Sequence, residues 1–294
     1  MSSAAEGIGT ASYPRFGRIA HLFASPVSAL GLAIVLLIVL SALFAPLIAP
    51  YDPTQIAVTQ KLKPPSLAHW FGTDQLGRDL LSRIVYGART ALSIAFLSTL
   101  LAGAVGLLLG MVAGYGPRWL DGLLVLLFDS MNALPMIMFA LAVITVLGGG
   151  TATLILVIVL TSMPAYARLV RAQTLALKNS EFILAERSLG AGPVRIILVH
   201  LLPNVVGPLA ILLSMDVPVI IMVEAGLSFL GLGVRPPTAS WGSILYDAYA
   251  NLRGAPSMVV FGGLPLVLAT LGFTFLGEAL RDALDPRLQV RRSL

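Results

Sequence analysis

The chain has 294 residues, of which 57% are apolar and only 11% are charged, and its mean hydropathy is +0.91. Soluble globular domains carry about 25% charged residues, so this composition excludes that class and indicates an integral membrane protein. The net charge of +5 is dispersed along the chain without clustered aromatic residues, which argues against a nucleic-acid-binding surface.

Apolar runs long enough to cross about 30 Å of hydrocarbon occur six times along the chain. We therefore predict an all-α, polytopic membrane protein with six transmembrane helices. A tail, residues 1–26, precedes the first helix, which is too long and too late in the chain for the apolar core of a signal peptide. The predicted helices cover residues 27–49, 91–114, 123–147, 152–171, 205–231 and 259–279.

The segment between the first two predicted spans, residues 50–90, carries charges with helical spacing. Asp74 lies four residues before Arg78, and Asp79 lies four residues before Arg83, which is the favourable order for ion pairs on a helix. The pattern predicts an amphipathic helix in this segment, and a solvated surface helix is sufficient to explain the charges.

The second predicted span contains a small residue at every fourth position. Ala102, Gly106, Gly110 and Gly114 share one face of a helix, and such a stripe allows a neighbouring helix to approach closely. Helix packing within the chain is the simpler interpretation, and an interface with a second membrane subunit is the alternative.

Two acids fall within predicted spans, where a charge is costly and usually faces a partner or an aqueous path. Asp129 lies in the third span, near Pro135, and Asp216 lies close to the middle of the fifth span. Both are candidate residues of a translocation path. For Asp216, the alternative is a buried structural hydrogen bond or a neutral acid.

A polar stretch, residues 178–204, separates the fourth and fifth spans and reads as two short helices. Gly190 ends the first helix and Pro203 is predicted to end the second. On a helical wheel one face of the first helix carries Phe182, Ala185, Glu186 and Leu189, whereas Leu184 lies opposite. The stretch is either a helix on the bilayer surface or a docking helix for a soluble partner.

Lysine and arginine residues indicate the orientation, because cytoplasmic loops are enriched in them. With six spans and a cytoplasmic N-terminus, twelve of these residues fall in inner segments and seven in outer loops. We therefore expect both termini, including the tail of residues 281–294, and the stretch 178–204 to be cytoplasmic.

The segment "LAERSLG", followed after nine residues by "HLLP", resembles the cytoplasmic coupling loop of ATP-binding-cassette importer permeases. Ala185, Gly190 and Pro203 match that loop, whereas Glu186 stands where the family prefers a small residue. Three further segments, residues 71–95, 224–242 and 280–287, are similar to the dipeptide, oligopeptide and nickel branch of the family, specifically to the shorter of its two permease subunits.

This resemblance implies a five-helix permease core, residues 91–280, with one additional N-terminal helix, in a bacterial or archaeal plasma (inner) membrane. It also implies four kinds of partner: membrane lipid, a second permease subunit, two cytosolic ATPase subunits and an extracytoplasmic substrate-binding protein. The resemblance assigns Phe182, Leu184, Ala185, Glu186, Leu189, Gly190 and Pro203 to an ATPase coupling loop. Because no lysine or arginine lies four residues from Glu186, we expect its partner on the ATPase.

The sequence contains no phosphate-binding loop and no catalytic constellation. We therefore expect a chain that is not an enzyme and binds no cofactor or metal, with ATP and magnesium on the partner ATPases. The absence of cysteine excludes thiolate metal sites. Peptides, glutathione-like solutes and nickel chelates remain open as substrates. A stand-alone secondary transporter would require internal repeats, which the sequence lacks, and a membrane scaffold without transport is a third interpretation.

Overall fold

The computed structural model describes residues 25–284, and their regular structure is helical throughout, which confirms the predicted all-α class. The predicted tails therefore lie almost entirely outside the described residues. The elements, in chain order, are α2 (Pro26–Leu43), α3 (Ala45–Ile48), the 3-10 helix η1 (Val58–Gln60), α4 (Leu80–Tyr115), α5 (Arg118–Asn132), α6 (Met136–Leu147), α7 (Thr151–Lys178), α8 (Glu181–Ser188), α9 (Pro193–Arg195), the π-helix η2 (Ile196–Leu201), α10 (Leu202–Phe229), α11 (Trp241–Ala250) and α12 (Ser257–Leu284).

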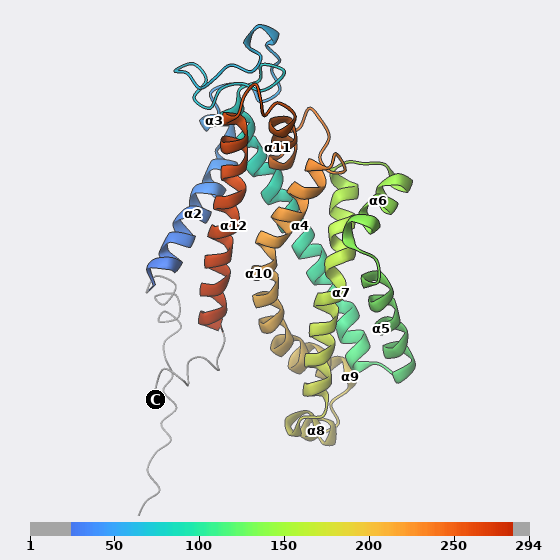
Figure 1. Cartoon of the computed structure of the whole chain (residues 1–294). Coiled ribbons are helices and arrows are strands. Elements are labelled where there is room, and N and C mark those ends of the chain that lie inside the picture. The colour runs from blue at the N-terminus through green and yellow to red at the C-terminus, as the bar shows by residue number, and fades with distance from the viewer. Residues whose placement is uncertain (1–24, 285–294) are drawn as a thin grey trace, which may run out of the picture.

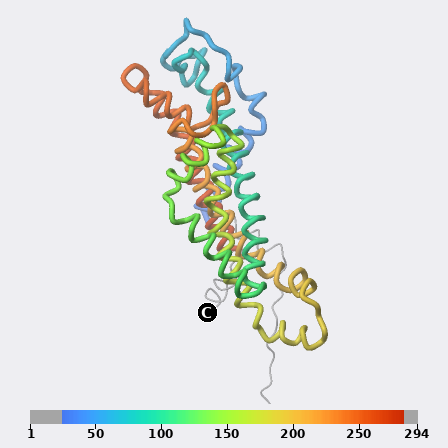
Figure 2. Tube along the Cα trace, turned by 90° about the vertical axis from the view of Figure 1, so that its right-hand side faces the viewer, coloured from blue at the N-terminus to red at the C-terminus, as the bar shows by residue number. Residues whose placement is uncertain are grey.

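The long helices form an elongated bundle (Figure 1). In the described part of the chain, five helices are long and apolar enough to cross a membrane, and the number is six if the bent pair of α5 and α6 is counted as one span. The start of α2 and the end of α12 lie toward the end where α8 is found, whereas residues 50–79 and α11 lie at the opposite end. Figure 2 shows the segment from α8 to α9 projecting from the bundle.

The third predicted span, residues 123–147, is broken rather than continuous. Helices α5 and α6 meet at 93° across a break of three residues. Pro135 lacks a backbone N–H and disfavours helical geometry at Leu134, so the helix ends before the proline and a new one begins after it. The single predicted span therefore corresponds to two helices, which are bent at the proline.

The predicted amphipathic helix before the second span was wrong. Residues 61–79 form an irregular segment, and α4 begins at Leu80 and continues into the span. Asp79 accepts a hydrogen bond from the backbone N–H of Ser82 (2.8 Å) and so caps α4. No helix forms between Gly72 and Gly77, because both glycines have positive φ and turn the chain back on itself.

The four charged side chains with this spacing are buried rather than solvated. Asp74 pairs with Arg78 (2.6 Å) as the spacing predicts, but Arg83 also approaches Asp74 (3.3 Å). Asp79 pairs with His69 (2.9 Å) instead of Arg83. The four-residue spacing of Asp74 and Arg78 therefore belongs to a turn and not to a helix, because residues i and i+4 can also meet in a folded loop.

The stripe of small residues on α4 packs against α7 within the chain. A Cβ atom added at Gly106 would lie 2.7 Å from the Cβ of Tyr166, and one at Gly110 would lie 2.5 Å from the carbonyl oxygen of Ala167. At Gly114 the nearest atom is the Cβ of Thr174, at 2.6 Å. Ala102 is fully buried and belongs to the same hydrophobic cluster. The close α4–α7 contact therefore requires residues without large side chains.

Candidate functional site

The α8 end of the bundle is tied to the end of α4 by basic side chains. The ammonium group of Lys178, at the end of α7, donates to the carbonyl oxygen of Tyr115 (2.9 Å). Lys178 and Arg187 also lie over the Tyr115 ring, 5.3 and 5.9 Å from its centroid. Because Arg187 belongs to α8, a displacement of α8 reaches the end of α4 directly through this contact.

Helix α8 is anchored by one side chain and otherwise exposes apolar residues. Ile183 is fully buried in the cluster that α4, α7 and α10 share. The exposed side chains of this surface are Phe182, Leu184, Ala185, Leu189, Val194 and Leu198. We call these six residues the coupling surface. The helical wheel separated Phe182 from Leu184, but both are exposed, because only the narrow side of α8 around Ile183 contacts the bundle.

The corner between α8 and α9 is a glycine-dependent helix end. Gly190 has φ of +86°, its N–H donates to the carbonyl oxygen of Arg187 (2.9 Å), and the N–H of Ala191 donates to that of Glu186 (3.0 Å). These two bonds form a Schellman motif, which satisfies the last carbonyl groups of α8. The predicted role of Gly190 thus has a conformational cause, since a Cβ added there would meet nothing within 4 Å.

We expect Gly190→Val to loosen this corner, because a β-branched residue in the left-handed region costs about 1–2 kcal/mol. Trypsin cleavage of the purified chain at Arg187 and Arg195 should then accelerate about tenfold through local opening. Gly192→Val is the matched control, because Gly192 has φ of −72° and equally open surroundings. Equal cleavage rates in the two variants would contradict the conformational role of Gly190.

Pro203 does not end the second helix, contrary to the prediction. The chain passes from α9 through the π-helix η2 into α10, which begins at Leu202 and carries Pro203 in its first turn. A proline is tolerated there because the wider π-helical turn before it removes the need for a regular hydrogen bond from its nitrogen. The fifth span is therefore a continuous helical passage, Pro193–Phe229.

Glu186 lies close to a histidine of the same chain, whereas its expected partner on the ATPase remains a prediction. Its Oε2 atom lies 3.5 Å from Nε2 of His200 in η2. The ring of His200 also lies beside that of Phe182, with centroids 6.4 Å apart. A helical wheel shows only neighbours within one helix. Glu186 contacts His200 because η2 runs back along α8 after the turn at Gly190.

The two candidate path acids lie in different surroundings. Asp129 is exposed on α5 and lies 4.0 Å from Arg168. Asp216 lines a cavity of about 280 Å³ between the α5–α6 break, α7 and α10, together with the polar side chains of Asn132, Thr161 and Ser162. Asp216, unlike Asp129, therefore lines a partly open cavity within the bundle, in which a few polar side chains stand among apolar ones.

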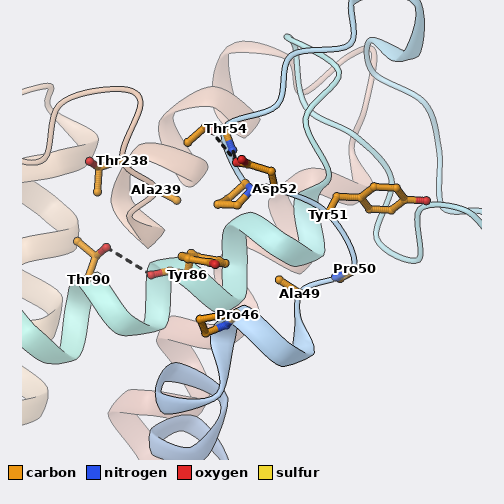
Figure 3. A pocket seen from close by; sticks show the side chains of 11 residues that line it. Pro46, Ala49, Pro50, Tyr51, Asp52, Thr54, Tyr86, Thr90, Thr238 and Ala239 are labelled. Atoms are coloured by element: carbon orange, nitrogen blue, oxygen red, sulfur yellow. Dashed lines mark hydrogen bonds between the residues drawn. The ribbon is translucent and has the colours of Figure 1, made fainter.

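A second cavity, of about 630 Å³, lies at the end opposite to α8 (Figure 3). Tyr86 and Thr90 of α4 face Asp52 and Thr54 of the preceding segment across it, with Thr238 nearby. The hydroxyl and the backbone N–H of Thr54 donate to Asp52 at 2.6 and 2.7 Å, and the pKa of Asp52 is lowered, so this carboxylate stays ionised at neutral pH. This cavity was not predicted from the sequence, because its lining residues are spread over three segments.

Buried contacts hold α4, α10 and α11 together at the same end. The indole N–H of Trp241, at the start of α11, donates to the carbonyl oxygen of Ile84 in α4 (3.0 Å). Glu224 in α10 is fully buried and accepts a hydrogen bond from Ser228 (2.7 Å). These groups are structural, and none of them faces either cavity.

Comparison with known proteins agrees with this arrangement. Residues 106–290 match the family described as "Binding-protein-dependent transport system inner membrane component", and residues 18–65 match the "N-terminal TM domain of oligopeptide transport permease C". The chain is 39% identical over 259 residues to the dipeptide transport system permease protein DppC of Alkalihalophilus pseudofirmus, covering 88% of this chain and 85% of the relative.

It is also 43% identical over 256 residues to the glutathione transport system permease protein GsiD of Escherichia coli, covering 87% of this chain and 84% of the relative. Among solved structures, a chain of the MetNI methionine ABC transporter in an inward-facing conformation matches with a TM-score of 0.57 and 18% identity. That match covers 69% of this chain and 97% of the other, and it shows a shared fold.

Proposed function

The chain belongs to the binding-protein-dependent inner membrane permeases of ATP-binding-cassette importers, and we propose that it forms one half of the translocation path for peptides or related small solutes. As a multi-pass membrane component it is a permease and not a catalytic enzyme. Membership of this family argues against the alternative that the chain is a stand-alone secondary transporter. The relatives favour a dipeptide or a glutathione-like solute as the substrate.

The observation that carries the proposal is the coupling surface at the projecting α8 end. Its apolar side chains are exposed on a helix that Ile183 holds in place and that contacts α4 through Arg187 and Tyr115. An exposed apolar surface of this kind marks a protein-binding site. In the proposed complex a cytosolic ATPase binds there, hydrolyses ATP with its own bound magnesium, and transmits its movement to the bundle through α8.

The other partners follow from the same assignment. A second permease subunit would complete the path, and the exposed apolar faces of the long helices would contact it or membrane lipid. A substrate-binding protein would deliver the solute to the opposite end, near Asp52 and Tyr86. Nickel chelates remain a possible cargo in place of a peptide, and the permease alone does not decide between them.

Purification of the tagged chain from its native membrane tests the proposal. We expect a second permease and an ATPase to be recovered in stoichiometric amounts. Recovery of the intact chain without any ATPase would support the scaffold interpretation and contradict the proposed function.

The orientation in the membrane is a further prediction. Both described ends of the bundle lie on the side of α8, and the excess of lysine and arginine puts this side in the cytosol. The chain has no cysteine, so single cysteines report the topology directly. In intact cells Thr238→Cys should react with a membrane-impermeant thiol reagent, and Ser188→Cys should react only after the cells are opened.

Thr238 is chosen because it is exposed, whereas the nearby Ser240 is buried at the start of α11. Reaction of both cysteines in intact cells would contradict the six-span topology. Reaction of Ser188→Cys alone would show that the orientation is inverted.

A further inference from the structure

The cavity at Asp216 lies inside the fifth membrane passage, well away from both of its ends. Asp216 is the fifteenth of the 28 residues of α10 and is only partly buried. The broken ends of α5 and α6 border the cavity through Asn132 and Met136. Non-helical backbone at membrane depth is tolerated where it lines an internal space, and in transporters such breaks accompany binding sites.

Asp216 has no cationic partner in the described part of the chain. None of the ion pairs among residues 25–284 includes it. The hydroxyl of Tyr166 lies near it but carries no positive charge, and this hydroxyl has no hydrogen-bond partner among the described residues. A carboxylate at this depth is costly without a counter-charge, so the structure leaves a position for a cation from outside the chain.

The remaining polar side chains of the cavity define what kind of cation fits. Asn132, Thr161 and Ser162 supply neutral oxygen acceptors near the single carboxylate. A primary ammonium group carries one positive charge and three N–H donors. The carboxylate can balance the charge, and the neutral oxygen atoms can accept the hydrogen bonds. A divalent metal is a poorer match, because no group of three histidine, aspartate or glutamate side chains suitable for a metal occurs in the described residues.

We propose that the Asp216 cavity binds the protonated amine of the transported solute during its passage. The inference rests on the proposed function and narrows the substrate to solutes that carry a primary ammonium group, as free peptides and glutathione do. At about 280 Å³ the cavity lies just below the usual range for a complete small-molecule site of about 300–1,000 Å³. It therefore accommodates the amine end of a peptide and leaves the remainder in the wider path.

A cysteine in the cavity tests this charge preference without dependence on the binding protein. Ser162→Cys places the only thiol of this chain beside Asp216, and the transporter is assembled with partner subunits whose own cysteines are replaced by serine. We compare its reaction with cationic 2-aminoethyl methanethiosulfonate and with anionic 2-sulfonatoethyl methanethiosulfonate, each relative to a free thiol in solution. The cationic reagent should be favoured about tenfold, since one nearby charge attracts one reagent and repels the other.

Adding Asp216→Asn should abolish the preference, because the amide keeps the shape of the side chain and removes its charge. Asp129→Asn, which neutralises an acid outside the cavity, is the matched control and should retain the preference. A preference that survives Asp216→Asn would overturn the proposal. So would the absence of any preference in Ser162→Cys, which is the result expected if a basic residue of the second permease already pairs with Asp216.

ATP-driven uptake by the transporter with the unaltered chain is measured in parallel. Failure of that uptake would contradict the proposed function, whereas normal uptake combined with a charge-independent reaction at Ser162→Cys would overturn the amine site alone.

Discussion

Replacing Gly110 with valine is expected to prevent the close packing of α4 on α7 and to cost the chain about 3 kcal/mol or more of stability. A Cβ at this position would lie 2.5 Å from the carbonyl oxygen of Ala167 and 2.7 Å from the Cβ of Val170. A backbone carbonyl cannot rotate away as a flexible side chain can, so the helices must separate. Overpacking typically costs 1–3 kcal/mol, and a clash with backbone lies at the upper end of that range.

The measurement is the fraction of detergent-extracted protein that remains monodisperse on heating, with Gly207→Val as the control. Gly207 is an exposed glycine of α10, and a Cβ added there meets nothing within 4 Å. The control therefore introduces the same residue into a membrane helix without a clash. Equal heat resistance of Gly110→Val and Gly207→Val would show that α4 and α7 do not pack as described.

Replacing Leu189 with aspartate is expected to abolish ATPase binding while the permease remains folded. The Leu189 side chain is 84% exposed, so its replacement should change stability by less than about 0.5 kcal/mol. In the proposed complex it is buried, and an unpaired carboxylate there would cost about 3 kcal/mol, which weakens association by about a hundredfold. The measurement is the amount of ATPase that co-purifies with the variant.

Leu67→Asp is the matched control for this effect. Leu67 is 98% exposed in the segment at the opposite end of the bundle, so the same substitution adds the same charge away from the coupling surface. Normal ATPase recovery with Leu67→Asp and loss with Leu189→Asp would support the assignment. Normal recovery with both would mean that the coupling surface lies elsewhere.

The predicted spans correspond to helices in the structure because long apolar runs leave few alternatives in a bilayer. The stripe of small residues from Ala102 to Gly114 predicted a close helix contact, because small residues at every fourth position let a neighbouring helix approach. Both features are local in sequence. Composition and periodicity were therefore sufficient to predict the all-α class and the six passages of the chain.

Several contacts that the sequence did not indicate join segments that are distant in sequence. Asp79 meets His69 because two glycines reverse the chain, and Glu186 meets His200 because η2 returns along α8. The break before α6 had a local signal in Pro135, but its angle of 93° depends on packing around it. Ile183, the residue that anchors α8, was not identified because a wheel of eight residues does not show which side faces the bundle.

Uptake by proteoliposomes that contain this chain with its co-purified permease and ATPase tests the central claim most directly. With the binding protein outside and ATP inside, we expect accumulation of a labelled dipeptide or of labelled glutathione that requires ATP and this chain. Accumulation that proceeds without ATP, or at the same rate when this chain is omitted, would contradict its assignment as an importer permease.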